Sequence, residues 1–315
     1  MTDTIATMPS QHNYFYFYTP TSLSISNAFI SSDGSKPIWI DYATDITIAS
    51  VTISLENWLP DSSKAVVDIY CDSYYLTTIA TSNIQIICDS SPMAMSQVFS
   101  SKKLYAAYHS NITVSNCDFN KQSSSSQYFI ISTNPHVSVF DNITFDNVTF
   151  GSYSSQILIE VTGNPTMSVS TISNINIVCS AQKMVMQKAI DSNTLLDVYY
   201  ANITVTNCDF SNFSALSSPT FIYASSPTTS AIDNVTFNNV TAGNDTSQTL
   251  IWATGSYSKS VSNISNIQIT CSSLPMAMPW AIYTFEQWVC IFSNQSKNQS
   301  QRPYRFIIRG LRKLL

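Results

Sequence analysis

Glycine and charge are both scarce in this chain of 315 residues. It has only 6 glycines, and charged residues make up 10%, against about a quarter in a typical soluble domain. With 14 Lys and Arg against 19 Asp and Glu, the chain lacks the basic surface that nucleic-acid binding requires. The shortage of charge also argues against a coiled coil. No apolar run reaches the roughly 18 residues of a membrane-spanning helix, so we expect no membrane span.

Serine, threonine and asparagine take the place of charge and together form about a third of the chain. Apolar residues make up 44%, which argues against disorder. The first residues, M-T-D-T-I-A-T-M-P-S, show no secretory leader. Eleven N-x-S/T sequons nevertheless occur, which is either an effect of composition or a sign of glycosylation. We favour an extracellular or cell-surface location and expect that the true N-terminus is missing.

An internal repeat is the strongest signal. The string N-I-Q-I-I-C at Asn83 returns as N-I-N-I-V-C at Asn174, 91 residues later, and as N-I-Q-I-T-C at Asn266. Between these copies, N-I-T-V-S-N-C-D-F at Asn111 returns at Asn202 in nearly the same form. All copies share N-[I/V]-x-[I/V/F], and the interval falls within the range of solenoid repeats, at about 30 residues. Nine such rungs start at Ser22, Asp45, Asn83, Asn111, Asn142, Asn174, Asn202, Asn234 and Asn266.

Apolar residues alternate within each rung, as Ile112 and Val114 do around Thr113. A period of two indicates a half-buried strand. A second short apolar run, such as Ile157-Leu158-Ile159, follows most rungs. Strands that recur at this interval without a helical period between them predict an all-β, parallel solenoid in which each coil stacks on the last.

The fifth residue after each rung start is polar or cysteine. Counted by alternation from the strand it points inward, and so do residues after it, which predicts a bend. Because a buried polar group needs hydrogen bonds, we expect asparagine amides to stack here in a corner ladder. The predicted ladder is Asn27, Ser50, Cys88, Asn116, Asn147, Cys179, Asn207, Asn239 and Cys271.

The cysteines of this corner allow two interpretations. Cys117 follows Cys88 by one coil length of the repeat, and Cys208 follows Cys179 by the same interval. Two equivalent disulfides would join neighbouring coils, provided that the Cα atoms lie within about 7 Å. The alternative is that all four are buried free thiols.

The coil length, the rungs and the asparagine corner resemble the right-handed parallel β-helix, or pectin-lyase-like, superfamily. They resemble in particular the Asn- and Ser-rich β-helix segments of protist surface proteins. The resemblance covers residues 20–294 and implies about nine to ten coils of roughly 30 residues, a usual repeat length for a solenoid. Many of these relatives cleave polysaccharides with clustered carboxylates, but the superfamily's N-T-D, D-D, G-H-G and R-I-K motifs are absent.

We therefore expect a non-enzymatic extracellular or cell-surface β-helix, structural or adhesive, that contacts glycans or other surface proteins. It could be part of a larger surface protein. The alternative is a polysaccharide lyase or glycoside hydrolase of the same superfamily. We assign no catalytic residues and expect no cofactor. Outward-facing sequons make candidate glycosylation sites of Asn111, Asn142, Asn202 and Asn234.

Methionines follow the corner cysteines in the pattern C-x4-M-x-M. Thioethers and thiolates are soft ligands that suit Cu(I), but no histidine joins them, so we favour methionine as filler of irregular space and predict no metal site. The residues are Met93, Met95, Met184, Met186, Met276 and Met278.

The two ends differ from the repeat. Residues 1–19 are expected to form an N-terminal cap or a leader remnant, with Tyr14 to Tyr18 as a capping strand. Residues 295–315 form a tail with six basic residues. This tail could be an amphipathic helix on a membrane surface, a cap on the last coil, or the foreign end of a mis-spliced or frame-shifted chain. We favour the third because the pattern breaks within a strand.

Overall fold

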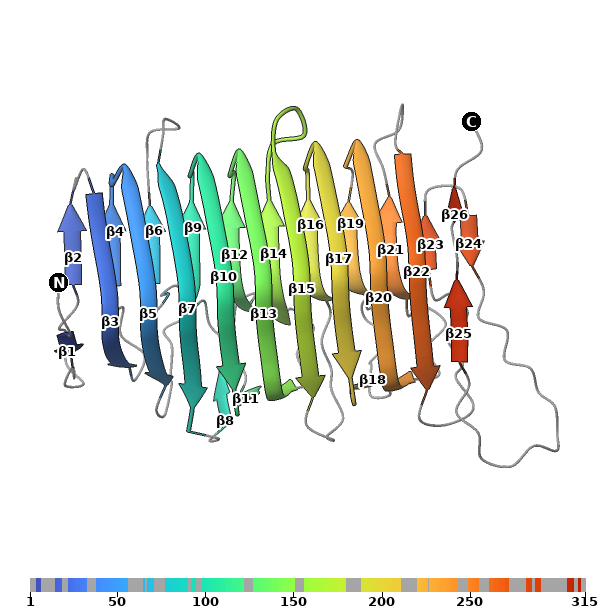
Figure 1. Ribbon diagram of the computed structural model, residues 1–315, viewed down its shortest axis with the longest axis horizontal. Coiled ribbons are helices and arrows are strands. Elements are labelled where there is room, and N and C mark those ends of the chain that lie inside the picture. The colour runs from blue at the N-terminus through green and yellow to red at the C-terminus, as the bar shows by residue number, and fades with distance from the viewer. Residues whose placement is uncertain are drawn as a thin grey trace.

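The computed structural model describes residues 4–6, 15–18, 22–32, 38–55, 65, 67–70, 77–89, 92–94, 98–121, 127–150, 156–179, 188–210, 220–225, 227–242, 249–254, 261–271, 282–284, 287–289, 305–308 and 311–312. Strands account for all the regular structure in these residues, and no helix occurs among them. The strands form two large sheets, here called sheet A and sheet B, that face each other along the length of the molecule (Figure 1).

Sheet A contains the rungs. Its order is β1 (Thr4–Ala6), β3 (Ser22–Ser32), β5 (Asp45–Leu55), β7 (Thr78–Cys88), β10 (Ala106–Ser115), β13 (Val137–Phe150), β15 (Val169–Cys179), β17 (Asp197–Thr206), β20 (Thr229–Ala242), β22 (Val261–Cys271) and β25 (Arg305–Ile308). Four short strands lie beside this path: β8 (Pro92–Ala94), β11 (Asp118–Lys121), β18 (Asp209–Phe210) and β26 (Leu311–Arg312).

Sheet B contains the second apolar run of each coil. Its order is β2 (Phe15–Tyr18), β4 (Ile38–Asp41), β6 (Val67–Tyr70), β9 (Phe99–Lys102), β12 (Gln127–Thr133), β14 (Gln156–Thr162), β16 (Lys188–Asn193), β19 (Thr220–Ser225), β21 (Thr249–Thr254), β23 (Ile282–Thr284) and β24 (Gln287–Val289).

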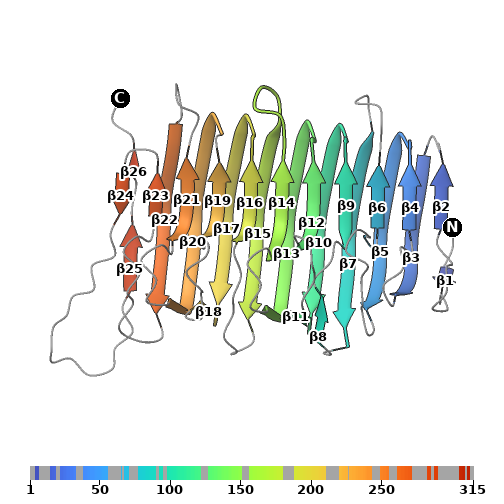
Figure 2. The same ribbon diagram turned by 180° about the vertical axis from the view of Figure 1, so that it is seen from behind.

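The chain winds as a parallel β-solenoid with coils of about 31 residues, which confirms the predicted fold. In Figure 1 the strands of sheet A lie in front and run downwards, those of sheet B lie behind and run upwards, and the chain advances from left to right. Figure 2 shows the same path from behind. This sense of rotation is right-handed, as parallel crossovers nearly always are. The nine predicted rungs coincide with the nine strands from β3 to β22.

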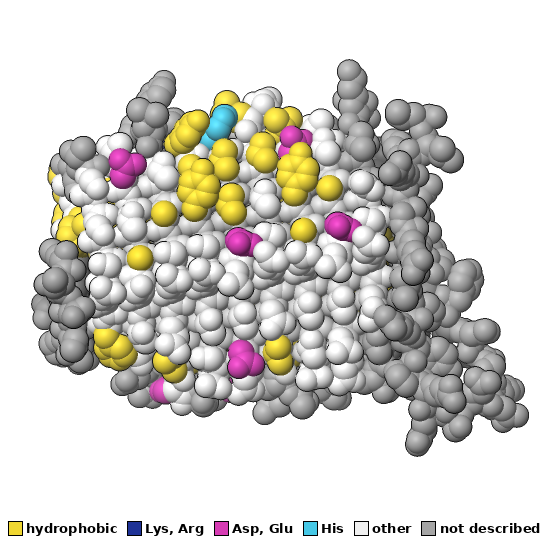
Figure 3. Space-filling view, in the orientation of Figure 1, with side chains coloured by type: hydrophobic (Ala, Val, Ile, Leu, Met, Phe, Trp, Pro, Cys, Tyr) yellow, Lys and Arg dark blue, Asp and Glu magenta, His cyan; other side chains and the backbone are white. Residues whose placement is uncertain are grey.

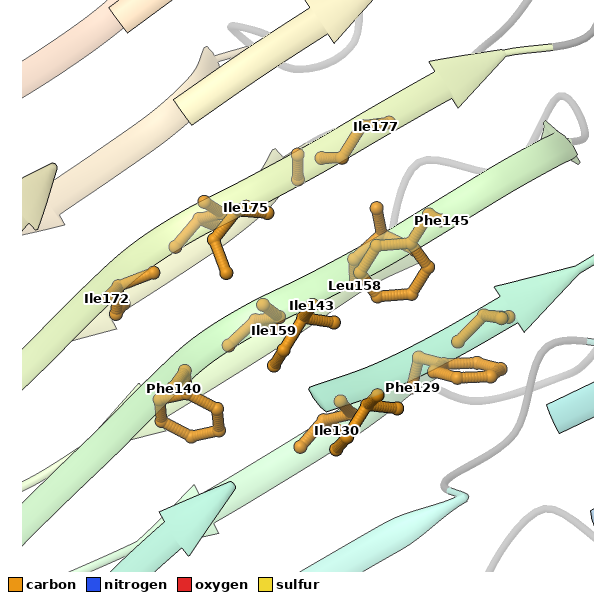
Figure 4. Packing of buried hydrophobic residues seen from close by; sticks show 14 of the residues in the cluster. Phe129, Ile130, Phe140, Ile143, Phe145, Leu158, Ile159, Ile172, Ile175 and Ile177 are labelled. Atoms are coloured by element: carbon orange, nitrogen blue, oxygen red, sulfur yellow. The ribbon is translucent and has the colours of Figure 1, made fainter. Parts of the chain in front are cut away.

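Isoleucine, valine and phenylalanine fill the space between the sheets. Ile112 and Val114 of β10 are fully buried, whereas Thr113 between them is exposed. The register places Ile112 between Ile84 of β7 and Ile143 of β13, so each inward column continues from coil to coil. Figure 4 shows side chains from both sheets meeting in this space. Truncating one buried isoleucine to alanine in such a core costs about 2–5 kcal/mol.

The two ends of the solenoid are built differently. At the first end, β1 and β2 pair in parallel with β3 and β4, so they continue the coil. At the last end, β25 and β26 pair antiparallel with β22, and β24 turns back antiparallel on β23. The helical alternative for the tail is therefore wrong for Arg305–Ile308 and Leu311–Arg312. These residues cover the edge of the last long strand instead, because its unpaired N–H and C=O groups need partners.

Candidate functional site

One column on the outer face of sheet A is nearly the same in every coil. The register aligns the rung asparagines, and the first two coils contribute Asn27 and Ser50. All nine residues have φ between 52° and 55°, a left-handed backbone that asparagine tolerates better than most residues. We call this column the Asn ladder: Asn27, Ser50, Asn83, Asn111, Asn142, Asn174, Asn202, Asn234 and Asn266.

Side-chain amides bond to one another along the Asn ladder. Nδ2 of Asn111 donates to Oδ1 of Asn83 at 3.1 Å, and Nδ2 of Asn142 donates to Oδ1 of Asn111 at 2.7 Å. Three coils further on, Nδ2 of Asn234 donates to Oδ1 of Asn202 at 2.7 Å. The Asn ladder therefore satisfies polar groups at the point where the left-handed residue bends each strand.

Aspartate replaces an amide acceptor in every third coil. Nδ2 of Asn174 donates to Oδ1 of Asp141 at 2.7 Å, and Nδ2 of Asn266 donates to Oδ1 of Asp233 at 2.8 Å. Asp233 also accepts a hydrogen bond from Oγ of Ser265 at 2.6 Å. The hydrogen bonds from Ser265 and Asn266 lower the pKa of Asp233, because they favour the ionised carboxylate.

The predicted corner ladder is corrected in two ways. Asn27 and Ser50 belong to the Asn ladder, because the first two rungs start five residues later than their alternation suggested. The remaining asparagines of the prediction are exposed rather than inward, and each has a φ between 52° and 59°. Alternation holds only for extended backbone, so counting it up to a left-handed residue assigns that residue to the wrong face. The residues are Asn116, Asn147, Asn207 and Asn239.

These four asparagines form two separate pairs. Nδ2 of Asn147 donates to Oδ1 of Asn116 at 2.9 Å, and Nδ2 of Asn239 donates to Oδ1 of Asn207 at 2.8 Å. Each is an extra residue relative to the neighbouring cysteine coil, because the register of β13 with β15 shifts between Asp146 and Val148. The predicted cysteine substitution for asparagine is therefore wrong.

The buried column next to these asparagines contains Cys88, Cys117, Cys179 and Cys208. Cys88 and Cys179 are buried, and Cys271 of β22 pairs in register with Val240 of β20. Disulfides join Cys88 to Cys117 and Cys179 to Cys208, with Cα–Cα distances of 5.0 and 5.1 Å. Of the two interpretations of these four cysteines, the structure has the disulfides. Each one fastens neighbouring strands of sheet A at the same place, three coils apart.

The four candidate glycosylation asparagines, Asn111, Asn142, Asn202 and Asn234, are all exposed members of the Asn ladder. Each Nδ2 carries two hydrogens, so a glycan on one still leaves the other for the bond within the ladder. Asn147 and Asn239, which the alternation placed inside, are exposed as well. Glycosylation at any of these sites stays a prediction.

One histidine lies inside the coil. His109 is fully buried, with Nδ1 hydrogen-bonded to the Thr81 hydroxyl at 2.8 Å. Its ring stacks on Phe140 at a centroid distance of 5.0 Å. Nε2 is also buried and has no hydrogen-bond partner among the described residues. Burial lowers the pKa of His109 to about 4, because the cation would lose its hydration. His109 is therefore neutral at physiological pH.

Two neighbouring carboxylates lie on the outer face of sheet B. The register places Glu160 of β14 beside Asp191 of β16, one strand spacing apart, or about 4.8 Å. Burial and the charge of Asp191 raise the pKa of Glu160 to about 7. Burial also raises the pKa of Asp191, against the opposing effect of Lys188. Near neutral pH the pair is therefore protonated in a fraction of the molecules.

Polar contacts surround the two carboxylates. Nζ of Lys188 lies 2.7 Å from Oδ2 of Asp191 in an ion pair, and Nδ2 of Asn193 donates to Oδ1 at 2.7 Å. The Thr162 hydroxyl donates to Oε1 of Glu160 at 3.1 Å, whereas the buried Oε2 has no partner among the described residues. Nζ of Lys188 also lies 3.8 Å from the centroid of the Tyr223 ring.

The Glu160–Asp191 pair is not among the residues predicted from the sequence. The signal was present, because Glu160 follows Ile157-Leu158-Ile159 and Asp191 lies 31 residues later, which is one coil length. The side chains of the six methionines of the C-x4-M-x-M pattern, Met93 to Met278, lie outside the described part of the structure. The described residues contain no group of three or more His, Cys, Asp or Glu that could hold a metal ion.

Within the part of the chain that the structure describes, no helix is long and apolar enough to span a membrane. Comparison of the chain with protein-family models, with curated proteins and with solved structures yields no match.

Proposed function

We propose that this protein is a non-enzymatic β-helix of the cell surface or extracellular space, with a structural or adhesive role. The outer face of sheet A carries this proposal. It is a continuous surface of aligned strands whose bends the Asn ladder holds at the same position in every coil. Hydroxyl and amide side chains cover most of it, and a group of exposed tyrosines stands out from them. Such a face suits contact with a glycan or another surface protein.

Two observations support the location. Disulfides persist mainly in oxidising compartments, and two of them join neighbouring coils here. Four sequon asparagines are exposed on one face. The narrower relationships, to the pectin-lyase-like superfamily and to β-helix segments of large protist surface proteins, belong to the same proposal. The coil length and the right-handed winding support them.

A bead assay tests the adhesive role. Beads coated with the full chain should be retained on surfaces of insoluble polysaccharide or matrix protein more than albumin-coated beads are. Thr113→Lys, on the outer face of sheet A, should weaken this retention. The matched change Thr133→Lys, on the outer face of sheet B, should not. No retention above albumin on any surface, or an equal effect of the two changes, would contradict the role of this face.

Polysaccharide cleavage is a second candidate, and the Glu160–Asp191 pair favours it. Retaining glycosidases hold their two carboxyl groups about 5 Å apart, and one of them stays protonated near neutral pH. The contacts of Lys188, Asn193 and Thr162 with these carboxylates argue for a structural role instead. Incubating neutral and acidic polysaccharides with the wild type and with Glu160→Gln decides between them. We expect no new reducing ends with either; release by the wild type alone would establish the enzyme.

A further inference from the structure

Exposed aromatic side chains gather on the outer face of sheet A, near the start of its strands. Tyr108 of β10 and Tyr199 of β17 are 41% and 40% exposed. The register runs from Tyr108 to Val139, Thr171 and Tyr199 in turn, so the two tyrosines share one column, three strand spacings or about 14 Å apart. Figure 3 shows hydrophobic side chains over this part of the face, in the upper half of the view.

The turns that lead into these strands extend the group. Tyr105 stacks on His136, with ring centroids 5.2 Å apart, and Tyr105 is itself exposed. Met167 is exposed in the turn before β15, which the Ser168 hydroxyl holds by donating to the Pro135 carbonyl at 2.6 Å. We call this group the tyrosine patch: Tyr105, Tyr108, His136, Val139, Met167 and Tyr199.

Charge around the tyrosine patch has one sign. Asp141 and Asp233 lie between the column of Tyr108 and the Asn ladder. Among the described atoms of this face, Figure 3 shows acidic groups and no lysine or arginine. A polyanion such as an acidic polysaccharide would be repelled here, because nothing on the face neutralises it. The acidic groups therefore exclude a polyanion as the occupant.

The arrangement of the tyrosine patch suits a sugar polymer better than a protein. Protein interfaces bury about 800 Å² on each partner around a closely packed apolar centre. Here the apolar groups are separated by polar residues such as Thr171, and hydroxyl and amide side chains border them. A pyranose ring has the matching chemistry, since its C–H face packs on an aromatic ring while its hydroxyl groups bond to amides and alcohols. Tyrosine offers this contact at a low cost in side-chain entropy.

We propose that the tyrosine patch binds a neutral polysaccharide, laid across the strands of sheet A along the axis of the solenoid. The strand spacing of about 4.8 Å is close to the length of one hexose unit. Successive sugars would then lie over successive coils, with Tyr108 and Tyr199 packing on units three apart. This inference rests on the proposed function, because it names the ligand class of the same contact surface.

Co-sedimentation of the full chain with insoluble polysaccharides tests the inference. Cellulose, chitin and insoluble β-1,3-glucan serve as neutral probes, and affinity electrophoresis with polygalacturonate serves as the acidic one. We expect binding to at least one neutral polymer and none to the acidic one. The double change Tyr108→Ala/Tyr199→Ala should weaken binding by about tenfold or more, the loss of roughly 1.4 kcal/mol. Tyr108→Phe/Tyr199→Phe should retain it, because the rings remain.

Tyr18→Ala is the matched control, because Tyr18 is an exposed tyrosine on sheet B. It should bind like the wild type, and thermal unfolding should show that all variants remain folded. Failure to bind any neutral polysaccharide, an equal loss in Tyr18→Ala, or preference for polygalacturonate would overturn the inference. If beads are retained on matrix protein while no polysaccharide binds, the proposed adhesive function survives and only this ligand class is wrong.

Discussion

Two columns of outward-facing side chains, one on each sheet, show opposite relations to the repeat. The Asn ladder on sheet A is almost invariant. The column on sheet B that contains Glu160 changes in nearly every coil, from Tyr16 of β2 to Tyr283 of β23, with Asp191 in between. Both columns lie on parallel strands of the same solenoid.

Backbone conformation explains the difference. Each Asn-ladder residue has a φ between 52° and 55°, and side chains without a local polar group are disfavoured there. That requirement returns with every coil, so the residue returns with it. The column on sheet B is ordinary extended strand, which accepts any residue that packs. The Asn ladder of sheet A is therefore conserved from coil to coil because its backbone conformation restricts the residue type. The extended backbone of sheet B does not restrict it, which allows individual features such as the Glu160–Asp191 pair.

Removing a disulfide should show how far covalent links hold sheet A together. Each bond closes a loop with a sequence separation of 29, for which the chain-entropy model gives about 3.5 kcal/mol. Cys88→Ala/Cys117→Ala should lower the free energy of unfolding by about this amount in urea titrations. Cys179→Ala/Cys208→Ala is its matched partner, because the loop length is equal. A loss below about 1 kcal/mol in both would show that stacking alone holds the coils.

Glu160→Gln should remove the contribution that sheet B makes to the pH dependence of the free energy of unfolding. The pKa of Glu160 is about 7 against an ordinary 4.5, so the native state binds more protons than the unfolded chain between these values. The contribution of Glu160 to stability therefore falls as pH rises through this window, by at most roughly 3 kcal/mol. Denaturant titrations at pH 4.5 and pH 8 isolate this contribution, because the stability of the wild type relative to Glu160→Gln should fall by about this amount. The stability of the wild type relative to Asp191→Asn should fall by less. Equal slopes in all three proteins would rule the pair out as its source.

Asn142→Val should test the backbone requirement of the Asn ladder. Valine in a left-handed conformation costs about 1–2 kcal/mol, and the lost bond to Asn111 adds about 1 kcal/mol. Asn142→Gly removes the same hydrogen bond without the strain, so it should cost clearly less. Urea unfolding of both variants separates the two effects. If glycine is as harmful as valine, the amide bonds rather than φ select asparagine.

His109→Phe should remove the contribution of sheet A to the pH dependence of stability, because His109 is the buried histidine of β10. The pKa of His109 is about 4 against an ordinary 6.5, so the unfolded chain binds more protons between these values. Its contribution to stability is full above pH 6.5 and is lost as pH falls, about 2 kcal/mol by pH 5. Acid titration of the variant should lack this loss. Because Glu160 contributes with the opposite sign over nearly the same pH range, the loss is measured as the difference between wild type and His109→Phe. Identical pH profiles for these two proteins would contradict this origin.

Much of the fold could be predicted because period-two alternation and coil-length recurrence are local properties of the chain. Ile112, Thr113 and Val114 alone predict which face of β10 is buried, and the rung spacing predicts which strands stack. The orientation of Asn116 could not be obtained this way, because Asn116 itself has a left-handed backbone and does not follow the alternation of the extended strand before it. Glu160 and Asp191 were not predicted because neither residue stands out in its own coil. Their raised pKa values depend on burial and on the neighbouring coil.

The sequence by itself determined that this chain is an all-β parallel solenoid with nine rungs, since a continuous core requires the same apolar pattern in every coil. It also placed the cysteines one coil apart. Only the tertiary structure decided which asparagines form the Asn ladder, that neighbouring cysteines are bonded, and that Tyr108 and Tyr199 share one exposed column. Those facts depend on register and on backbone rotation between coils, which bring together residues that lie one or more coil lengths apart in the chain.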